Sequence, residues 1–252
     1  MYPIIFEVGP IRIASYGLMM AIGFLAGLYL LKRELVRRKL DIAMADRIVL
    51  AAMLGGVVGS KLFYVFFEAL DLALQDPVGM IFSGYGFTWY GGLIGGTGTV
   101  LWTLRRHGCL DLQYLDAMAP SLAIGYFFGR GGCQLSGDGC YGVPTDLPWG
   151  MAYPKGTVPT LERVHPAPVY EMLEMAVVFS VLWVLRTRIR RPGILFCLYL
   201  VMIGIARFAV EFVRRNPRVA LDLTVHQWVS IGLVLFGSAY AIWLRRHQKT
   251  LS

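Results

Sequence analysis

Long apolar stretches separated by short charged loops are the feature that most constrains the fold of this chain. The first stretch, Ile13 to Leu31, contains no charged residue and is followed by the basic cluster KRELVRRK. A helix needs about 20 apolar residues to cross the hydrocarbon core of a bilayer. Only 16% of the chain is charged, against roughly a quarter in an ordinary soluble domain. We therefore expect a membrane protein rather than a soluble globular one.

The same pattern recurs along the chain and predicts an all-α, polytopic membrane protein with seven transmembrane helices. Because the apolar runs are continuous rather than alternating, the backbone must be hydrogen-bonded within helices, and a β-barrel is excluded. We expect a single integral membrane domain over residues 1–252, with a small irregular non-cytoplasmic cap at about 134–165. The predicted spans are Ile13 to Leu31, Ile48 to Leu70, Phe87 to Leu104, Leu115 to Cys133, Val169 to Leu185, Ile194 to Val213 and Val225 to Leu244.

The basic residues predict the orientation of these spans. Most lysines and arginines lie in the loops that follow the first, third, fifth and seventh spans, and the other loops hold few. Cytoplasmic loops carry such an excess, so the N-terminus is predicted to be periplasmic and the C-terminus cytoplasmic. No basic segment precedes the first span, which is therefore expected to stay as an anchor rather than be cleaved. The net charge of +8 is spread between the apolar runs, so no nucleic-acid partner is expected.

Glycines occur in two settings that predict different roles. Pairs spaced four apart on the second and third predicted spans predict close helix packing in lipid. These pairs are Gly55 with Gly59, Gly91 with Gly95, and Gly92 with Gly96. The run GRGGCQLSGDGCYG lies instead where the fourth span ends, and its backbone amides are candidates for an anion-binding nest beside Arg130.

Lys61, Arg130, Arg207 and Glu211 lie within the predicted spans. A charge at bilayer depth costs at least about 2.5 kcal/mol, so such residues either pair with one another, extend to the interface or serve a function. Glu211 lies one helical turn beyond Arg207 and is its expected partner.

The sixth span favours the functional interpretation. Arg207, Glu211 and Arg214 are spaced i, i+4 and i+7, which places them on one face of a continuous helix. With Arg130 and Lys61 the set has four positive charges and one negative charge. Arginine binds phosphate through two parallel hydrogen bonds, so an anion such as a lipid phosphate is the expected ligand.

Seven ordered segments are similar to those of one enzyme family. They are SYGLMMAIGF, GGVVGSKLFYV, WYGGLIGG, DAMAPSLAIGYFFGRGGC with SGDGCYG, HPAPVYE, GIARFAVEFVRRNP and HQWVS. Nearly end to end, the chain resembles the prolipoprotein diacylglyceryl transferases of bacteria. The resemblance implies a seven-span enzyme of the bacterial cytoplasmic (inner) membrane. It would move the diacylglyceryl group of phosphatidylglycerol onto the lipobox cysteine in the signal peptide of a prolipoprotein. Glycerol phosphate would leave and a thioether would remain.

The resemblance also assigns residues. Arg130 and Arg207 are similar to the essential arginines of the family near the lipid headgroup, toward the outer leaflet. With Tyr90 they form the predicted catalytic set, which needs no cofactor or metal. The predicted substrate-binding residues are Tyr16, Lys61, Asp138, Gly142, His165, Glu211 and Arg214.

Several positions depart from the family pattern. Tyr90 stands where the best-studied members have histidine, so a histidine base is not available there. Cys133 and Ser136 replace asparagines, Cys140 is unusual, and Lys61 replaces arginine. The arginines can favour the acceptor thiolate electrostatically, while Tyr90 either positions the headgroup, relays a proton or only packs against the glycines.

Two cysteines of the outer side leave further alternatives. Cys133 and Cys140 either form a disulfide or remain free thiols. A zinc site of Cys133, Cys140 and His165 has suitable ligand types but fits no standard spacing. Two other functions also remain open, a divergent family member acting on another lipid or thiol acceptor, and an organic-anion transporter. No readable inverted repeat supports the transporter.

Overall fold

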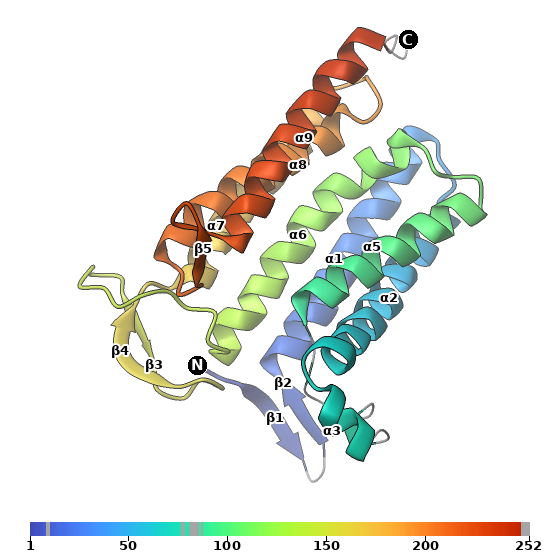
Figure 1. The fold of residues 1–252 in the computed structure, drawn as a ribbon. Coiled ribbons are helices and arrows are strands. Elements are labelled where there is room, and N and C mark those ends of the chain that lie inside the picture. The colour runs from blue at the N-terminus through green and yellow to red at the C-terminus, as the bar shows by residue number, and fades with distance from the viewer. Residues whose placement is uncertain (9–10, 77–78, 81–85, 87, 248–252) are drawn as a thin grey trace. The chain divides into compact units, whose positions relative to one another are not determined.

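The computed structural model describes residues 1–8, 11–76, 79–80, 86 and 88–247. Helices dominate the described chain (Figure 1). They are α1 (Ser15–Arg38), α2 (Ala43–Phe67), α3 (Leu70–Gln75), α5 (Trp89–Arg106), α6 (Leu112–Ser136), α7 (Ala167–Leu185), α8 (Ile194–Val210), the 3-10 helix η1 (Glu211–Val213) and α9 (Val225–His247). Three two-stranded antiparallel sheets add β1 (Ile4–Val8) with β2 (Ile11–Ala14), β3 (Met151–Tyr153) with β4 (Thr160–Val164), and β5 (Arg218–Ala220) with β6 (Leu223–Thr224).

The helices agree with a multi-pass membrane protein. Within the described ranges, five are long and apolar enough to cross a bilayer, namely α1, α2, α7, α8 extended by η1, and α9. Helices α5 and α6 overlap the third and fourth predicted spans, but both are less apolar. Seven crossings and the orientation of the termini therefore stay predictions.

Several predicted boundaries were wrong at the ends of helices. Ile13 lies in β2 rather than in a span, and α1 continues past Leu31 to Arg38. Lysine and arginine are good helix formers, and their positive charges stabilise a helix C-terminus, so the basic cluster extends the helix instead of ending it. The predicted start of the third span, Phe87, lies outside the described residues.

The chain forms two compact units, which are described separately. The larger combines Met1–Glu34 with Leu115–Ser252, and the smaller is Leu35–Tyr114. The prediction of a single integral membrane domain is not tested by this division.

The core of the larger unit lies between α6, α7 and α8. Ala119 and Ala123 of α6 present small side chains to Met175 and Leu182 of α7 and to Leu195 of α8. Figure 1 shows α7, α8 and α9 side by side. Close packing of these apolar faces fixes the ends of α6, α7 and α8. The charged side chains of the site project from these three helix ends.

Buried polar contacts fix the positions of these helices relative to one another. On α6, Asp116 accepts hydrogen bonds from the backbone amides of Gly193 (3.0 Å) and Phe196 (2.8 Å), so it caps the start of α8. Arg186 at the end of α7 donates to the buried Glu34 of α1 over 2.7 Å. Helices α1, α6, α7 and α8 are thereby fixed in register.

The cap is more regular than predicted, since β3 and β4 form a hairpin within it. Tyr141, Tyr153 and Val164 form its small core. The chain leaves α6 through Gly137 (φ +60°) and Gly139 (φ +86°), a left-handed conformation that glycine adopts without strain. The prediction of an amide nest in GRGGCQLS was wrong, because this part of the run is helical and its amides lie within α6.

In the smaller unit, α2 and α5 lie side by side (Figure 1) and pack through their glycines. A Cβ atom added to Gly59 would lie 2.4 Å from the carbonyl oxygen of Gly91, and one added to Gly95 would lie 2.3 Å from that of Gly55. Thr99 of α5 donates to the carbonyl of Ala51 over 2.8 Å. The prediction that these glycines serve close helix packing is confirmed.

We expect Gly95→Ala to destabilise the protein by about 1–3 kcal/mol, the usual cost of forcing an extra group into a packed interface. Gly98 lies in the same helix but has no atom within 4 Å of an added Cβ. The matched variant Gly98→Ala is expected to be neutral or to gain up to about 1 kcal/mol from helix propensity. Thermal unfolding in detergent, followed by circular dichroism, measures both. Equal stability of the two variants would contradict the packing interpretation.

Candidate active site

The buried carboxylate of Glu171 lies at the centre of the charged site in the larger unit. Its side chain is 1% exposed and projects from the N-terminal part of α7. Arg130 Nε of α6 lies 2.6 Å from Oε2, and Arg214 Nη1 lies 2.8 Å from Oε1. Arg207 Nη1 of α8 lies 3.5 Å from Oε1. Arg130, Arg207 and Arg214, here called the arginine cluster, therefore surround one carboxylate.

Tyr126 fixes one side of this arrangement. One helical turn before Arg130 on α6, its hydroxyl donates a hydrogen bond of 2.5 Å to Glu171 and accepts one of 3.1 Å from Arg130 Nη2. The guanidinium of Arg130 also lies 5.1 Å from the centre of the Tyr126 ring. Both the position and the plane of the Arg130 guanidinium are thus set by contacts from two helices.

A second buried carboxylate, Glu211, holds Arg207 from the other side. Arg207 Nη2 lies 2.9 Å from Glu211 Oε2, so the predicted pair is confirmed. Glu211 Oε1 accepts hydrogen bonds from Asn216 (2.5 Å) and Thr224 (2.9 Å) and lies 3.5 Å from His226 Nδ1. The end of α8 is thereby linked to the start of α9.

The prediction of one continuous helical stripe was wrong. Helix α8 ends at Val210, a 3-10 turn covers Glu211–Val213, and Arg214 is extended (φ −84°, ψ 162°). Pro217 follows Asn216 and disfavours helical geometry in the residue before it. Arg214 nevertheless reaches Glu171, because the chain turns back toward α7 instead of continuing along the α8 axis.

The charge balance of the site also differs from the prediction, which counted Glu211 alone as negative. Within the larger unit, three arginines face Glu171 and Glu211, which leaves a net charge of +1. Arg207 Nη1 is buried and makes no hydrogen bond with any described residue. A buried donor of this kind is costly unless a partner satisfies it. An anion with several acceptor oxygens, such as a phosphate, meets both requirements.

Sequence reasoning missed the central position of Glu171, although a signal was present. Glu171 and Glu174 both lie within the predicted fifth span, Val169 to Leu185, and were left out of the charges counted inside the membrane. Two carboxylates in an otherwise apolar run indicate buried cationic partners. Tyr126, by contrast, is one of several aromatic residues on α6 and has no such signal.

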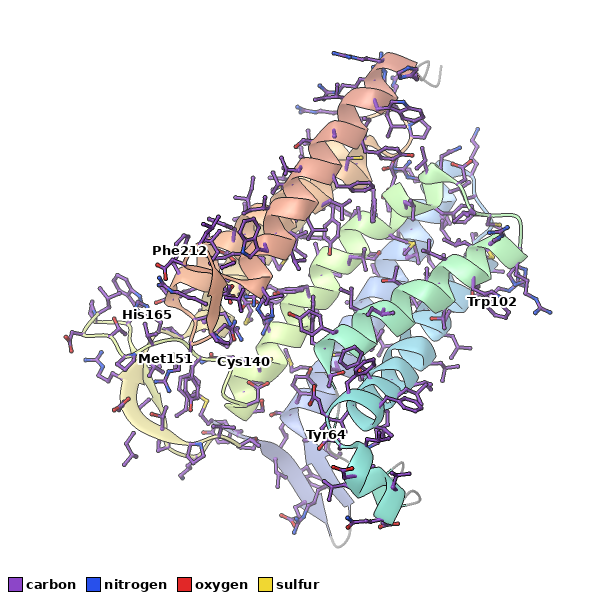
Figure 2. The ribbon with its side chains drawn as sticks, viewed as in Figure 1. Tyr64, Trp102, Cys140, Met151, His165 and Phe212 are labelled. Atoms are coloured by element: carbon purple, nitrogen blue, oxygen red, sulfur yellow. The ribbon has the colours of Figure 1, made fainter. Side chains whose placement is uncertain are left out.

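A sulfur-rich cluster adjoins Arg130 at the end of α6. Sulfur atoms of Cys133 and Cys140 and a carboxylate oxygen of Asp138 all lie within 4.8 Å of one another. Both cysteines are free thiols, and Figure 2 shows Cys140 beside the end of α6. Arg130 Nη1 lies 3.9 Å from Cys133 Sγ. A hydrogen bond with the Cys133 thiol, aided by two nearby arginines and opposed by burial, lowers the pKa of Cys140 to about 7.

Tyr16 lies beside this cluster, near the start of α1. A Cβ atom added to Gly132 of α6 would lie 3.0 Å from the Tyr16 ring, so the two helices touch next to Cys133. The ring is 43% exposed. Tyr16 and Asp138 therefore share the neighbourhood of Arg130, as predicted for substrate-binding residues, although contact with substrate stays a prediction.

Gly142 and His165 connect the cap to the segment that carries Arg214. The Gly142 amide donates to the His165 carbonyl over 2.8 Å, and Arg215 Nε donates to the Gly142 carbonyl over 2.9 Å. A Cβ atom on Gly142 would lie 2.2 Å from the carbonyl oxygen of Val213. On its other side, His165 Nδ1 lies 3.2 Å from the Tyr170 hydroxyl. These contacts give both residues a structural role beside the predicted substrate-binding role.

Lys61 and Tyr90 belong to the smaller unit. Lys61 is buried on α2, and Tyr90 is half-buried at the start of α5, with its ring 5.2 Å from that of Trp89. Their participation in the site stays a prediction.

Known proteins are similar to this chain over nearly its whole length. The family model for prolipoprotein diacylglyceryl transferase matches residues 3–243. A phosphatidylglycerol–prolipoprotein diacylglyceryl transferase of Nitratidesulfovibrio vulgaris (strain DP4) is 36% identical over 92% of this chain and 88% of its own length. The enzymes so named from Clostridium tetani and Chromohalobacter salexigens are 32% and 34% identical, over 94% and 97% of this chain and 95% and 92% of their own lengths. The chain therefore belongs to the prolipoprotein diacylglyceryl transferase family.

Proposed function

We propose that this protein is a transferase that moves the diacylglyceryl group of phosphatidylglycerol to a cysteine thiol of a prolipoprotein. The names of relatives that match nearly the whole chain support this activity. The observation that carries it in the structure is the arginine cluster, with its net positive charge and the buried Nη1 of Arg207, which lies 3.5 Å from Glu171 Oε1 but makes no hydrogen bond with a described residue. The lipid phosphate is the proposed ligand of that atom.

The chemistry of the reaction explains why a net positive site is needed. The acceptor thiolate forms a bond to the terminal carbon of the diacylglyceryl group, and the bond from that carbon to the phosphate oxygen breaks. The electron pair of this bond leaves with glycerol phosphate, so the charge on the phosphate changes from −1 to −2. Fixed donors aimed at developing negative charge stabilise the transition state most. Arg130 and Arg207 are proposed to do so.

Glu171 is proposed as a positioning residue. Three guanidinium groups repel one another at these distances, and a buried charge without a partner is strongly unfavourable. The Glu171 carboxylate contacts all three, which keeps them together while leaving an excess of positive charge for the substrate. Glu211 serves Arg207 in the same way.

The finer assignments follow the family. The acceptor is proposed to be the lipobox cysteine of a signal peptide, and the membrane the bacterial cytoplasmic membrane, with seven crossings and the site toward the outer leaflet. Apolar side chains exposed on the spanning helices support insertion in lipid, for example Leu25, Leu54 and Phe236. The products of the transfer assay described next identify the lipid and the thiol acceptor that this protein uses.

Replacing Arg130 or Arg207 with Gln should lower transfer by about 10²–10³-fold, the loss seen when one donor to a developing oxyanion is removed. Purified protein in detergent is assayed with phosphatidylglycerol and a lipobox peptide, by glycerol phosphate release and peptide mass. Arg218→Gln is the control, because Arg218 is exposed and pairs with Asp222 on the surface. Normal turnover in both arginine variants would contradict the proposed phosphate site.

Glu171→Gln should destabilise the protein by about 3–5 kcal/mol, since it leaves buried guanidinium groups without their shared carboxylate. Glu174→Gln, on the same helix, removes none of the ion pairs described above and is the matched control. Chemical unfolding in detergent measures both variants. If they lose equal stability, Glu171 does not organise the arginine cluster.

Tyr90→Phe tests whether the hydroxyl takes part in the chemistry, since the aromatic ring is retained. We expect transfer to fall by about 10²-fold, the lower end of the range for proton transfer by a positioned side chain. The rate of glycerol phosphate release at saturating lipid is the measurement. An unchanged rate would assign Tyr90 to packing against the glycines.

A further inference from the structure

We propose that Cys133, Asp138 and Cys140 form a zinc site with one open coordination position, next to Arg130. Among the described residues with suitable ligand atoms, these three lie within 4.8 Å of one another. The spacing Cys-x4-Asp-x-Cys matches no standard zinc pattern. The third ligand is Asp138 rather than His165, and only the fold shows this proximity.

The distances are close to those that zinc requires. Zinc binds thiolate sulfur at about 2.3 Å and carboxylate oxygen at about 2.0–2.2 Å in tetrahedral geometry, which separates neighbouring ligand atoms by roughly 3.5–3.8 Å. The observed limit of 4.8 Å exceeds this by about 1 Å, so the ligand atoms would have to move closer together when the metal binds.

The local backbone brings the three ligands together. Cys133 lies on the last turn of α6, and the chain reverses through Gly137 and Gly139, both at positive φ. Asp138 lies between these glycines, and its carboxylate accepts a hydrogen bond from the Cys140 amide over 3.1 Å. The amide of Val158 donates to the Gly137 carbonyl over 2.9 Å, so the cap holds the loop in place.

The charges around the cluster suit a divalent cation held by thiolates. Two thiolates and one carboxylate carry −3, so bound zinc would leave a net charge of −1. Arg130 Nη1 lies 3.9 Å from Cys133 Sγ, so its guanidinium faces this negative charge as well as Glu171. Sulfur ligands select zinc over magnesium and calcium, which prefer oxygen ligands.

Three protein ligands leave the fourth zinc position open, as in catalytic rather than structural zinc sites. Resting on the proposed function, we assign this position to the sulfur of the acceptor cysteine. Zinc binds the thiolate, so the thiol proton passes to water on binding, and the sulfur then supplies the electron pair for the bond to the glyceryl carbon. This arrangement would supply an activated acceptor thiolate next to Arg130.

Metal content tests the site without any lipid or peptide. Full-length protein is purified in detergent, zinc is measured by mass spectrometry, and the metal is then removed under reducing conditions and replaced by titrated Zn²⁺ or Co²⁺. We expect one zinc per chain and a thiolate-to-cobalt charge-transfer band. Cys133→Ser, Asp138→Asn and Cys140→Ser should each weaken metal binding by at least about tenfold.

Cys109→Ser and Cys197→Ser are the matched controls, since neither cysteine belongs to the cluster, and both should keep the metal. Absence of zinc and of a cobalt–thiolate band in reduced, folded wild-type protein would overturn the proposal. Metal affinity equal to that of the wild-type protein in all three cluster variants would also overturn it. The first result does not depend on whether a ligand variant folds less well, because it is measured on the wild-type protein.

The transfer assay separates this proposal from the proposed function. Bound zinc without any transfer would contradict the proposed function and leave the metal site standing. Transfer at an unchanged rate in the metal-free enzyme would overturn the role of zinc in holding the acceptor thiol. Transfer that is lost with the metal and restored by added Zn²⁺ would support both.

Discussion

The ion pairs between the arginine cluster and the buried carboxylate of Glu171 are the interaction on which the site depends. Arg130, Arg207 and Arg214 come from three different segments, and the carboxylate is what lets their positive charges lie together inside the protein. Burying any one of these charges alone would cost several kcal/mol. The helix packing of the larger unit therefore has to place all three arginine side chains around Glu171. The same contacts thus specify both the fold and the site.

That arrangement connects the fold to the chemistry. Because Glu171 and Glu211 neutralise only two of the three arginines, the site keeps one positive charge and a buried donor on Arg207. The leaving phosphate in the proposed reaction gains one negative charge, so a site with this excess positive charge would stabilise the transition state more than the bound lipid. Cys133 lies 3.9 Å from Arg130 Nη1, and the acceptor sulfur is proposed to bind beside it.

The proposed zinc site bears on how the acceptor thiol would lose its proton. A metal that binds the thiolate lowers the need for a strong base.

Small residues serve a separate purpose in the smaller unit, where Gly59 and Gly95 allow the backbones of α2 and α5 to approach each other closely.

The sequence by itself determined the helical membrane class, the glycine packing and the pairing of Arg207 with Glu211, because apolar length, small-residue spacing and helical spacing are local properties. Its seven motifs also identified the family. Only the tertiary structure decided that Glu171 is the centre of the arginine cluster, that Arg214 reaches it from outside the helix, and that Asp138 rather than His165 meets the two cysteines. These contacts join separate segments through a broken helix and a glycine turn, and no periodicity along the chain encodes where such a break brings the backbone.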